Sequence, residues 1–117
     1  MKKIYHLSTC STCQRILKEL EPLTGVELQE IKTKPITPAQ LAEMHKFAGS
    51  YEALFSRRAR LYQERGLKDK PLTENDYKNL ILEHYTFLKR PVILLENEIF
   101  IGNAKKDIEM AKNTLHP

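Results

Sequence analysis

The pattern of hydrophobic and polar positions predicts that the chain begins with a strand, a helix and a second strand. Residues 3–7 have strand-like residue types, and residues 26–32 alternate apolar with polar positions, as a half-buried strand does. Between them, apolar residues recur at spacings of one, three and four. This spacing predicts a helix from residue 11 to about residue 21 that Pro22 ends.

The middle of the chain is predicted to be helical. Thr37 is a suitable N-cap with Pro38 at the first helical position, and Gly49 closes the apolar pattern that follows. Residues 51–66 should form one or two short helices. Thr73 is a second N-cap, and its helix should end near residue 85.

The last third of the chain predicts a β-hairpin and a closing helix. Val92–Leu95 is a continuous apolar run after Pro91, and Glu98–Ile101 follows it across a two-residue polar turn. Apolar residues from 103 to about 115 then recur with helical spacing.

Together these elements predict an α/β fold. A strand–helix–strand start implies right-handed parallel pairing of the first two strands, and the hairpin can extend that sheet in the antiparallel sense. With helices on both faces, the layout is a thioredoxin-like mixed four-stranded sheet. We expect a single domain over residues 1–117, with about 37–85 inserted as a helical subdomain.

Composition and charge narrow the function classes only a little. The 117 residues carry 19 basic and 15 acidic side chains, a formal charge of +4. This mild excess does not argue for direct nucleic-acid binding. No apolar run approaches the ~18 residues of a membrane span, and no signal-peptide pattern opens the chain. We therefore expect a cytoplasmic protein without a membrane partner, and a monomer.

Candidate chemistry centres on Cys10 and Cys13, which lie where the first strand gives way to the first helix. Unpaired N–H groups and the helix dipole favour an anion there, and the thiolate is the nucleophilic form of cysteine. Cys10 is the candidate nucleophile of a redox pair. The alternatives are a buried structural pair and a zinc half-site. A structural zinc site usually needs four ligands, but the chain has no second cysteine pair and its four histidines are not spaced as ligands. No bound metal is therefore expected.

Two residues near the hairpin are candidates for the same site. Pro91 precedes a buried strand, where proline fits and where a cis peptide bond is plausible. In a thioredoxin-like fold this proline would face the cysteine loop. Arg90 could hold an anion near Cys10 with its fork of donors, or it could be an ordinary surface arginine.

Hydroxyl and guanidinium groups complete the candidates. Ser11 and Thr12 flank the sulfur and could bind an oxyanion, although such residues are also common helix caps. Arg58 lies in the densest positive cluster of the chain, of which part is expected to be an exposed helix face. One member pointing at the cysteine site would lower the thiolate pKa and bind an anionic substrate.

Three motifs carry a resemblance to a known family. They are Ile4-Tyr5-His6 leading to Cys10, Leu54-Phe55-Ser56-Arg57-Arg58 running on to Tyr62 and Gly66-Leu67, and Lys89-Arg90-Pro91-Val92. Through them the chain resembles, essentially from end to end, the arsenate reductase (ArsC-like) family with its Spx-type and YffB-type relatives. That family is thioredoxin-like with a helical insertion.

The resemblance implies roles for several positions. Family reductases use a cysteine at the place of Cys10 to attack an oxyanion such as arsenate, and they discharge the adduct through glutathione and glutaredoxin. The arginine before the family's cis-proline matches Arg90, and Arg58 fits the arginine of the Spx-type and YffB-type pattern. The place of a third arginine holds Gly102 and Asn103, so the arsenate pocket is incomplete.

Two functions of different classes follow. The first is a thiol-dependent reductase in which Cys10 attacks and Cys13 resolves, with glutathione or a thioredoxin/glutaredoxin-type protein as electron donor and no tightly bound cofactor. Its substrate would be a disulfide, a glutathione adduct or a small oxyanion. The second is an Spx-like redox-sensing regulator that binds the RNA polymerase α subunit, with the same two cysteines as its switch.

Overall fold

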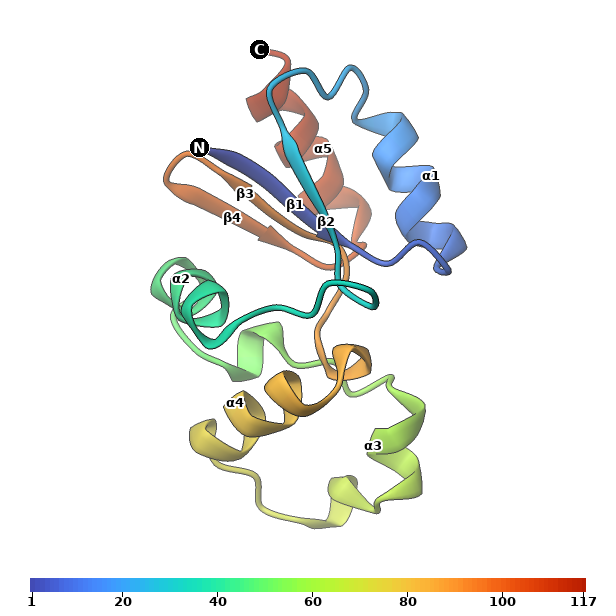
Figure 1. Ribbon diagram of the computed structural model, residues 1–117, viewed down its shortest axis with the longest axis vertical. Helices are drawn as coiled ribbons and strands as arrows, with labels where there is room; N and C mark the ends of the chain where they lie inside the picture. The colour runs from blue at the N-terminus through green and yellow to red at the C-terminus, as the bar shows by residue number, and fades with distance from the viewer. The chain divides into compact units, whose positions relative to one another are not determined.

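The computed structural model describes residues 1–117 and contains two compact units (Figure 1). The sheet unit comprises Met1–Pro35 together with Arg90–Pro117, and the helical unit comprises Ile36–Lys89. The helical unit interrupts the sheet unit in sequence, and each is described by itself below.

The sheet unit has the predicted topology. Its elements are β1 (Lys2–His6), α1 (Ser11–Glu19), β2 (Glu27–Glu30), β3 (Val92–Leu95), β4 (Glu98–Ile101) and α5 (Lys105–Leu115). The strand order is β2-β1-β3-β4. β1 pairs with β2 in parallel, whereas β1 with β3 and β3 with β4 are antiparallel. The mixed four-stranded sheet of a thioredoxin-like fold is therefore confirmed.

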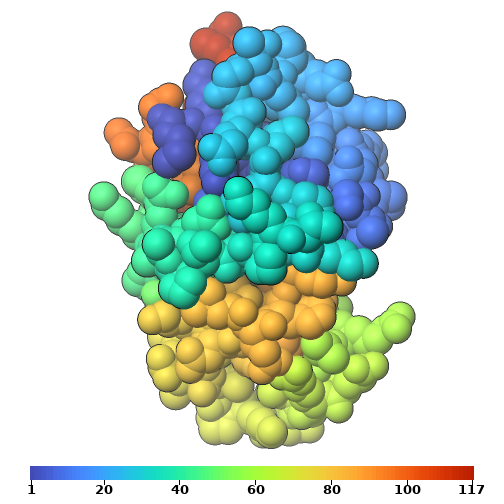
Figure 2. All heavy atoms as spheres, in the orientation of Figure 1, coloured from blue at the N-terminus to red at the C-terminus, as the bar shows by residue number.

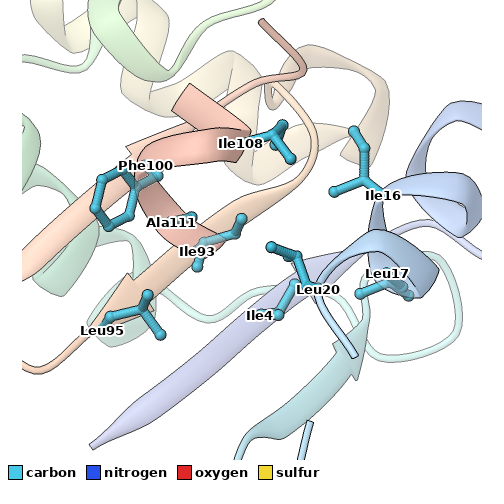
Figure 3. Close-up of a cluster of buried hydrophobic side chains, with 9 residues drawn as sticks. All are labelled: Ile4, Ile16, Leu17, Leu20, Ile93, Leu95, Phe100, Ile108 and Ala111. Atoms are coloured by element: carbon cyan, nitrogen blue, oxygen red, sulfur yellow. The ribbon is translucent and has the colours of Figure 1, made fainter. Parts of the chain in front are cut away.

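One face of this sheet carries the hydrophobic core of the unit (Figure 3). Ile4 and Ile93 are register partners on β1 and β3, and neither is accessible to solvent. Both α1 and α5 pack on this face, and in Figure 1 they lie on the same side of the sheet. The cluster consists of Ile4, Ile16, Leu17, Leu20, Ile93, Leu95, Phe100, Ile108 and Ala111. Burial of these side chains fixes α1 against β1, and with it the loop that joins them.

The helical unit contains α2 (Pro38–Ala48), α3 (Arg60–Glu64), α4 (Glu74–Glu83) and three short 3₁₀ helices. Both predicted N-caps form capping boxes. The Thr37 hydroxyl accepts from the Gln40 backbone N–H at 3.1 Å, and the Thr73 hydroxyl accepts from the Asp76 N–H at 3.2 Å. Each box satisfies backbone donors that the first helical turn would otherwise leave unpaired.

Aromatic packing forms the core of the helical unit. The fully buried Phe55 ring stacks on Phe87 with centroids 5.4 Å apart. It also contacts the rings of Tyr77 at 4.8 Å and Tyr62 at 5.9 Å. Such aromatic contacts add to the burial of apolar area.

Several elements differ from prediction at their ends. α1 stops at Glu19, because Leu20 already acts as its C-cap before Pro22. β2 stops at Glu30, whose own side chain accepts hydrogen bonds from the residues of the following turn. α5 begins at Lys105 rather than at residue 103, after Gly102 has turned the chain with a φ of 85°.

No helix of the structure is both long enough and apolar enough to span a membrane.

Candidate functional site

The loop from β1 to α1 places Cys10 at the N-cap of α1, in extended backbone conformation. The Cys10 N–H donates to the Leu7 carbonyl at 3.1 Å, and the Cys10 carbonyl accepts from the Gln14 N–H at 3.1 Å. The thiol thus occupies the position where a serine or aspartate side chain commonly caps a helix. The free N–H groups of the first turn are available to its sulfur.

Cys10 has the surroundings of a reactive thiol. It is partly exposed, and Figure 2 shows α1 and the loop before it at the molecular surface (blue spheres). Partial burial alone would raise the pKa of Cys10. The N–H groups of Cys13 and Thr12 at the helix N-terminus, the Cys13 thiol and the Arg90 charge together outweigh burial and lower the pKa below its ordinary value.

Cys13 is the opposite kind of thiol. Its side chain is inaccessible to solvent. Burial, assisted by the neighbouring Cys10 charge, raises the pKa of Cys13 to about 11, although the Leu7 N–H and Arg90 act in the other direction. The two sulfur atoms are hydrogen bonded to each other. At neutral pH, Cys13 therefore stays protonated, and its S–H group donates a hydrogen bond to the Cys10 sulfur.

Arg90, two residues before the start of β3, acts on this site through its charge. The positive charge of Arg90 lowers the pKa of both cysteines, so its guanidinium acts on the whole pair. The Arg90–Pro91 peptide bond is cis, a point that the sequence left open. The Pro91 carbonyl accepts from the Gly102 N–H at 2.9 Å, which ties the beginning of β3 to the end of β4.

The remaining predicted site residues differ in their exposure and position. Thr12 is partly buried, and its backbone N–H helps to lower the pKa of Cys10. Ser11 is exposed as the first residue of α1. Arg58 is an exposed side chain of the helical unit, just before α3. The roles of Ser11, Thr12, Arg58, Arg90 and Pro91 in substrate binding stay predictions.

Glu30, which we did not predict, braces the cysteine loop. Its Oε2 accepts from the Ser8 N–H at 2.8 Å and from the Ser8 hydroxyl at 3.1 Å. Its Oε1 accepts from the Lys32 N–H, the Thr33 N–H and the Thr33 hydroxyl at 2.8–3.0 Å. Burial would raise the pKa of Glu30, but the bonds from Ser8 and Thr33 lower it to about 2. Parallel pairing of β1 with β2 was the available signal, since it sets His6 beside Glu30.

Gln14 was also missed, and it secures the same loop from the helix side. Its side-chain nitrogen donates to the Leu7 carbonyl at 3.1 Å and lies 3.5 Å from the His6 Nδ1. Burial lowers the pKa of His6, while the Glu30 charge raises it by a smaller amount. The only signal for Gln14 in the sequence is a weak one, namely its position directly after Cys13.

This arrangement supports thiol chemistry. A partly exposed thiol with a lowered pKa can attack an electrophilic sulfur or oxyanion, and a second thiol lies within hydrogen-bonding distance of it. No group of three or more His, Cys, Asp and Glu side chains in residues 1–117 is arranged to hold a metal ion. The fold and the paired cysteines define a thioredoxin-like protein with an inserted helical unit.

Comparison with known proteins identifies the family. Residues 5–111 match the ArsC family, and the chain belongs to it. The predicted resemblance is thus confirmed.

Three relatives illustrate the range of the family. The chain is 26% identical over 109 residues to the global transcriptional regulator Spx 2 of Bacillus cereus, covering 90% of this chain and 82% of that protein. A solved structure of a possible arsenate reductase from Streptococcus mutans UA159 is 28% identical with a TM-score of 0.72, covering 93% and 98% of the two chains. The YFFB protein has a TM-score of 0.76 at 18% identity, covering 95% and 98%, and shows the shared fold.

Proposed function

We propose that the protein is a thiol-dependent reductase in which Cys10 is the nucleophile and Cys13 the resolving thiol. The observation that carries this proposal is the asymmetry of the pair. A partly exposed sulfur with a lowered pKa is hydrogen bonded to a buried sulfur with a raised pKa. The substrate would be a disulfide, a glutathione adduct or a small oxyanion, and for a disulfide the steps are as follows.

In the first step the Cys10 thiolate attacks one sulfur of the substrate disulfide. A bond forms between Cys10 and that sulfur, the substrate S–S bond breaks, and the other sulfur leaves as a thiolate. The N–H groups of Thr12 and Cys13 and the charge of Arg90 favour the anionic form of Cys10 before the attack.

In the second step Cys13 resolves the mixed disulfide. The charge of Cys10 and its hydrogen bond with Cys13 both contribute to the raised pKa of Cys13. Both contributions are lost once Cys10 is bonded to the substrate sulfur, so Cys13 becomes easier to deprotonate when it is needed. Its thiolate then attacks the Cys10 sulfur, the bond between Cys10 and the substrate sulfur breaks, and an internal disulfide forms. The substrate sulfur leaves as a thiolate, which can take up the proton that Cys13 gave up to solvent.

The cycle closes when an external donor reduces the Cys10–Cys13 disulfide with two electrons. Glutathione or a thioredoxin/glutaredoxin-type protein would supply them, and a cytoplasmic location would keep such donors reduced. Arg90 would bind anionic substrate or glutathione carboxylate beside Cys10. Ser11, Arg58 and Pro91 are the further residues proposed to contact it.

A glutathione-coupled assay on the mixed disulfide of glutathione and 2-mercaptoethanol tests the proposal. Cys10→Ser should abolish turnover. Cys13→Ser should accumulate a covalent adduct on Cys10 that mass spectrometry detects. Turnover that survives Cys10→Ser, or the absence of any adduct in Cys13→Ser, would contradict the mechanism.

A second candidate is favoured by the similarity to Spx 2. In this alternative the protein is a redox-sensing regulator, and oxidation of the cysteine pair changes a surface that binds the RNA polymerase α subunit. A pull-down with purified α subunit, performed on reduced and oxidised protein, separates the candidates. Strong binding in one redox state without reductase turnover would establish the regulator and overturn the enzyme.

A further inference from the structure

We propose that Glu30 is a positioning residue for the reactive thiol. It holds Ser8 in place by two hydrogen bonds and thereby keeps the cysteine loop in the geometry that directs backbone N–H groups at Cys10. The inference rests on the proposed function, because it matters only if Cys10 reacts as a thiolate. It assigns to a strand residue a role that the cysteine motif itself does not contain.

The carboxylate connects two segments that are 22 residues apart in sequence. Oε2 binds only to Ser8, in the loop before Cys10, and Oε1 binds only to Lys32 and Thr33, in the turn after β2. One side chain therefore connects both segments, and its five acceptor contacts leave none of the roughly four lone-pair sites of an ionised carboxylate unused.

Ser8 is joined by a single peptide bond to Leu7, and Leu7 touches both cysteines. The Leu7 carbonyl accepts from the Cys10 N–H at 3.1 Å, and the Leu7 N–H donates to the Cys13 sulfur. A shift of Ser8 would therefore move backbone groups that are bonded to the site. Gln14, on α1, donates a hydrogen bond to the Leu7 carbonyl. Glu30, at the end of β2, accepts the hydrogen bonds of the neighbouring Ser8.

Glu30 also carries a negative charge, which would by itself disfavour a thiolate nearby. A purely electrostatic role would make Glu30→Gln lower the pKa of Cys10. A positioning role predicts the opposite sign, because an amide has only one acceptor atom. Its NH₂ group must then face either the donors of Ser8 or those of the turn. The direction of the change thus distinguishes geometry from charge.

The test is the pH dependence of iodoacetamide labelling of Cys10, followed by peptide mass mapping, in wild type, Glu30→Gln and Glu27→Gln. Glu27 is the matched control, since it lies on the same strand but bonds to Lys3. We expect Glu30→Gln to move the Cys10 profile to higher pH and to slow labelling at pH 6 by at least about threefold. Glu27→Gln should follow the wild-type profile.

A Glu30→Gln profile equal to that of wild type, or one moved to lower pH, would overturn the positioning role even if the melting temperature falls.

If Glu30→Gln does not fold, two milder variants replace it. Ser8→Ala removes the hydroxyl that donates to Oε2, and Thr33→Val removes the hydroxyl that donates to Oε1. A shift in Ser8→Ala that exceeds the one in Thr33→Val supports the proposal, and equal profiles overturn it. A wild-type profile at the ordinary thiol value would instead overturn the proposed function, and the positioning role with it.

Discussion

The two sulfur atoms of the pair differ because their surroundings differ. Cys10 and Cys13 are three residues apart, yet the first is partly exposed at a helix N-cap and the second is fully buried within the first turn. The same residue type thus gives an acidic, reachable thiol and a protonated, enclosed one. The difference between their pKa values follows from the helix N-terminus, from burial and from their mutual hydrogen bond, with a further contribution from the Arg90 charge.

Arg90 should matter more for the charge at the site than for folding. Its guanidinium lowers the pKa of Cys10, so Arg90→Ala should raise that pKa and slow alkylation at pH 7. Sulfate affinity should fall as well, which competition with alkylation measures. Arg15→Ala is the control, because Arg15 is an exposed α1 residue that faces Glu19. A large drop in melting temperature with unchanged sulfate affinity would assign Arg90 a structural role.

Residue-level prediction from the sequence succeeded where the interaction is local. A cysteine that follows a strand and precedes a helix must lie near free N–H groups, so the N-cap position of Cys10 could be predicted. Glu30 could not be found in this way, because its partner Ser8 is remote in sequence and becomes a neighbour only through the register of two parallel strands.

Among the elements, the helices of the helical unit begin at sharply defined caps. The Thr73 hydroxyl accepts from the Asp76 N–H, and the Asp76 carboxylate accepts from the Thr73 N–H at 2.8 Å. These bonds start α4 at Glu74, as the sequence predicted. The start of α5 was predicted less well, because Gly102 first turns the chain with a positive φ and the helix begins only at Lys105.

Removing a cap should measurably destabilise the chain. Thr73→Ala deletes the hydroxyl acceptor of the α4 box and should lower the free energy of unfolding by about 1 kcal/mol. Urea denaturation followed by circular dichroism measures this loss. Thr24→Ala, at an exposed turn position, is the control. Equal stability of the two variants would mean that the capping box contributes nothing in solution.

At the scale of the whole molecule, the sheet unit carries the cysteine site, and the helical unit has an aromatic core of its own. The sheet unit gathers β1, α1 and β3 around the apolar cluster that contains Ile4 and Ile93. These are the elements that carry or adjoin the cysteines and Arg90. Alternating strand patterns and helical periodicity predicted these strands and helices, and the apolar positions of those patterns form the cluster.

The central position of Ile93 makes it a strong test of that core. Ile93→Ala removes buried methyl groups from β3 and should lower the free energy of unfolding by about 2–5 kcal/mol. The control is Met110→Ala on α5, whose side chain is 46% exposed and should matter little. Urea unfolding curves of both variants against wild type give the answer. Similar small losses for the two would show that Ile93 is not in the core described.

The chemistry as a whole depends on Cys10 being ionised more readily than Cys13. The direct measurement is the rate of iodoacetamide labelling of each cysteine in the folded wild-type chain as a function of pH, with the two sulfur atoms separated by mass mapping. We expect the labelling rate of Cys10 to reach half of its maximum at a pH below the ordinary thiol pKa. We expect Cys13 to stay unlabelled until the pH approaches its pKa of about 11. Equally slow labelling of both cysteines, with no early ionisation at Cys10, would contradict it.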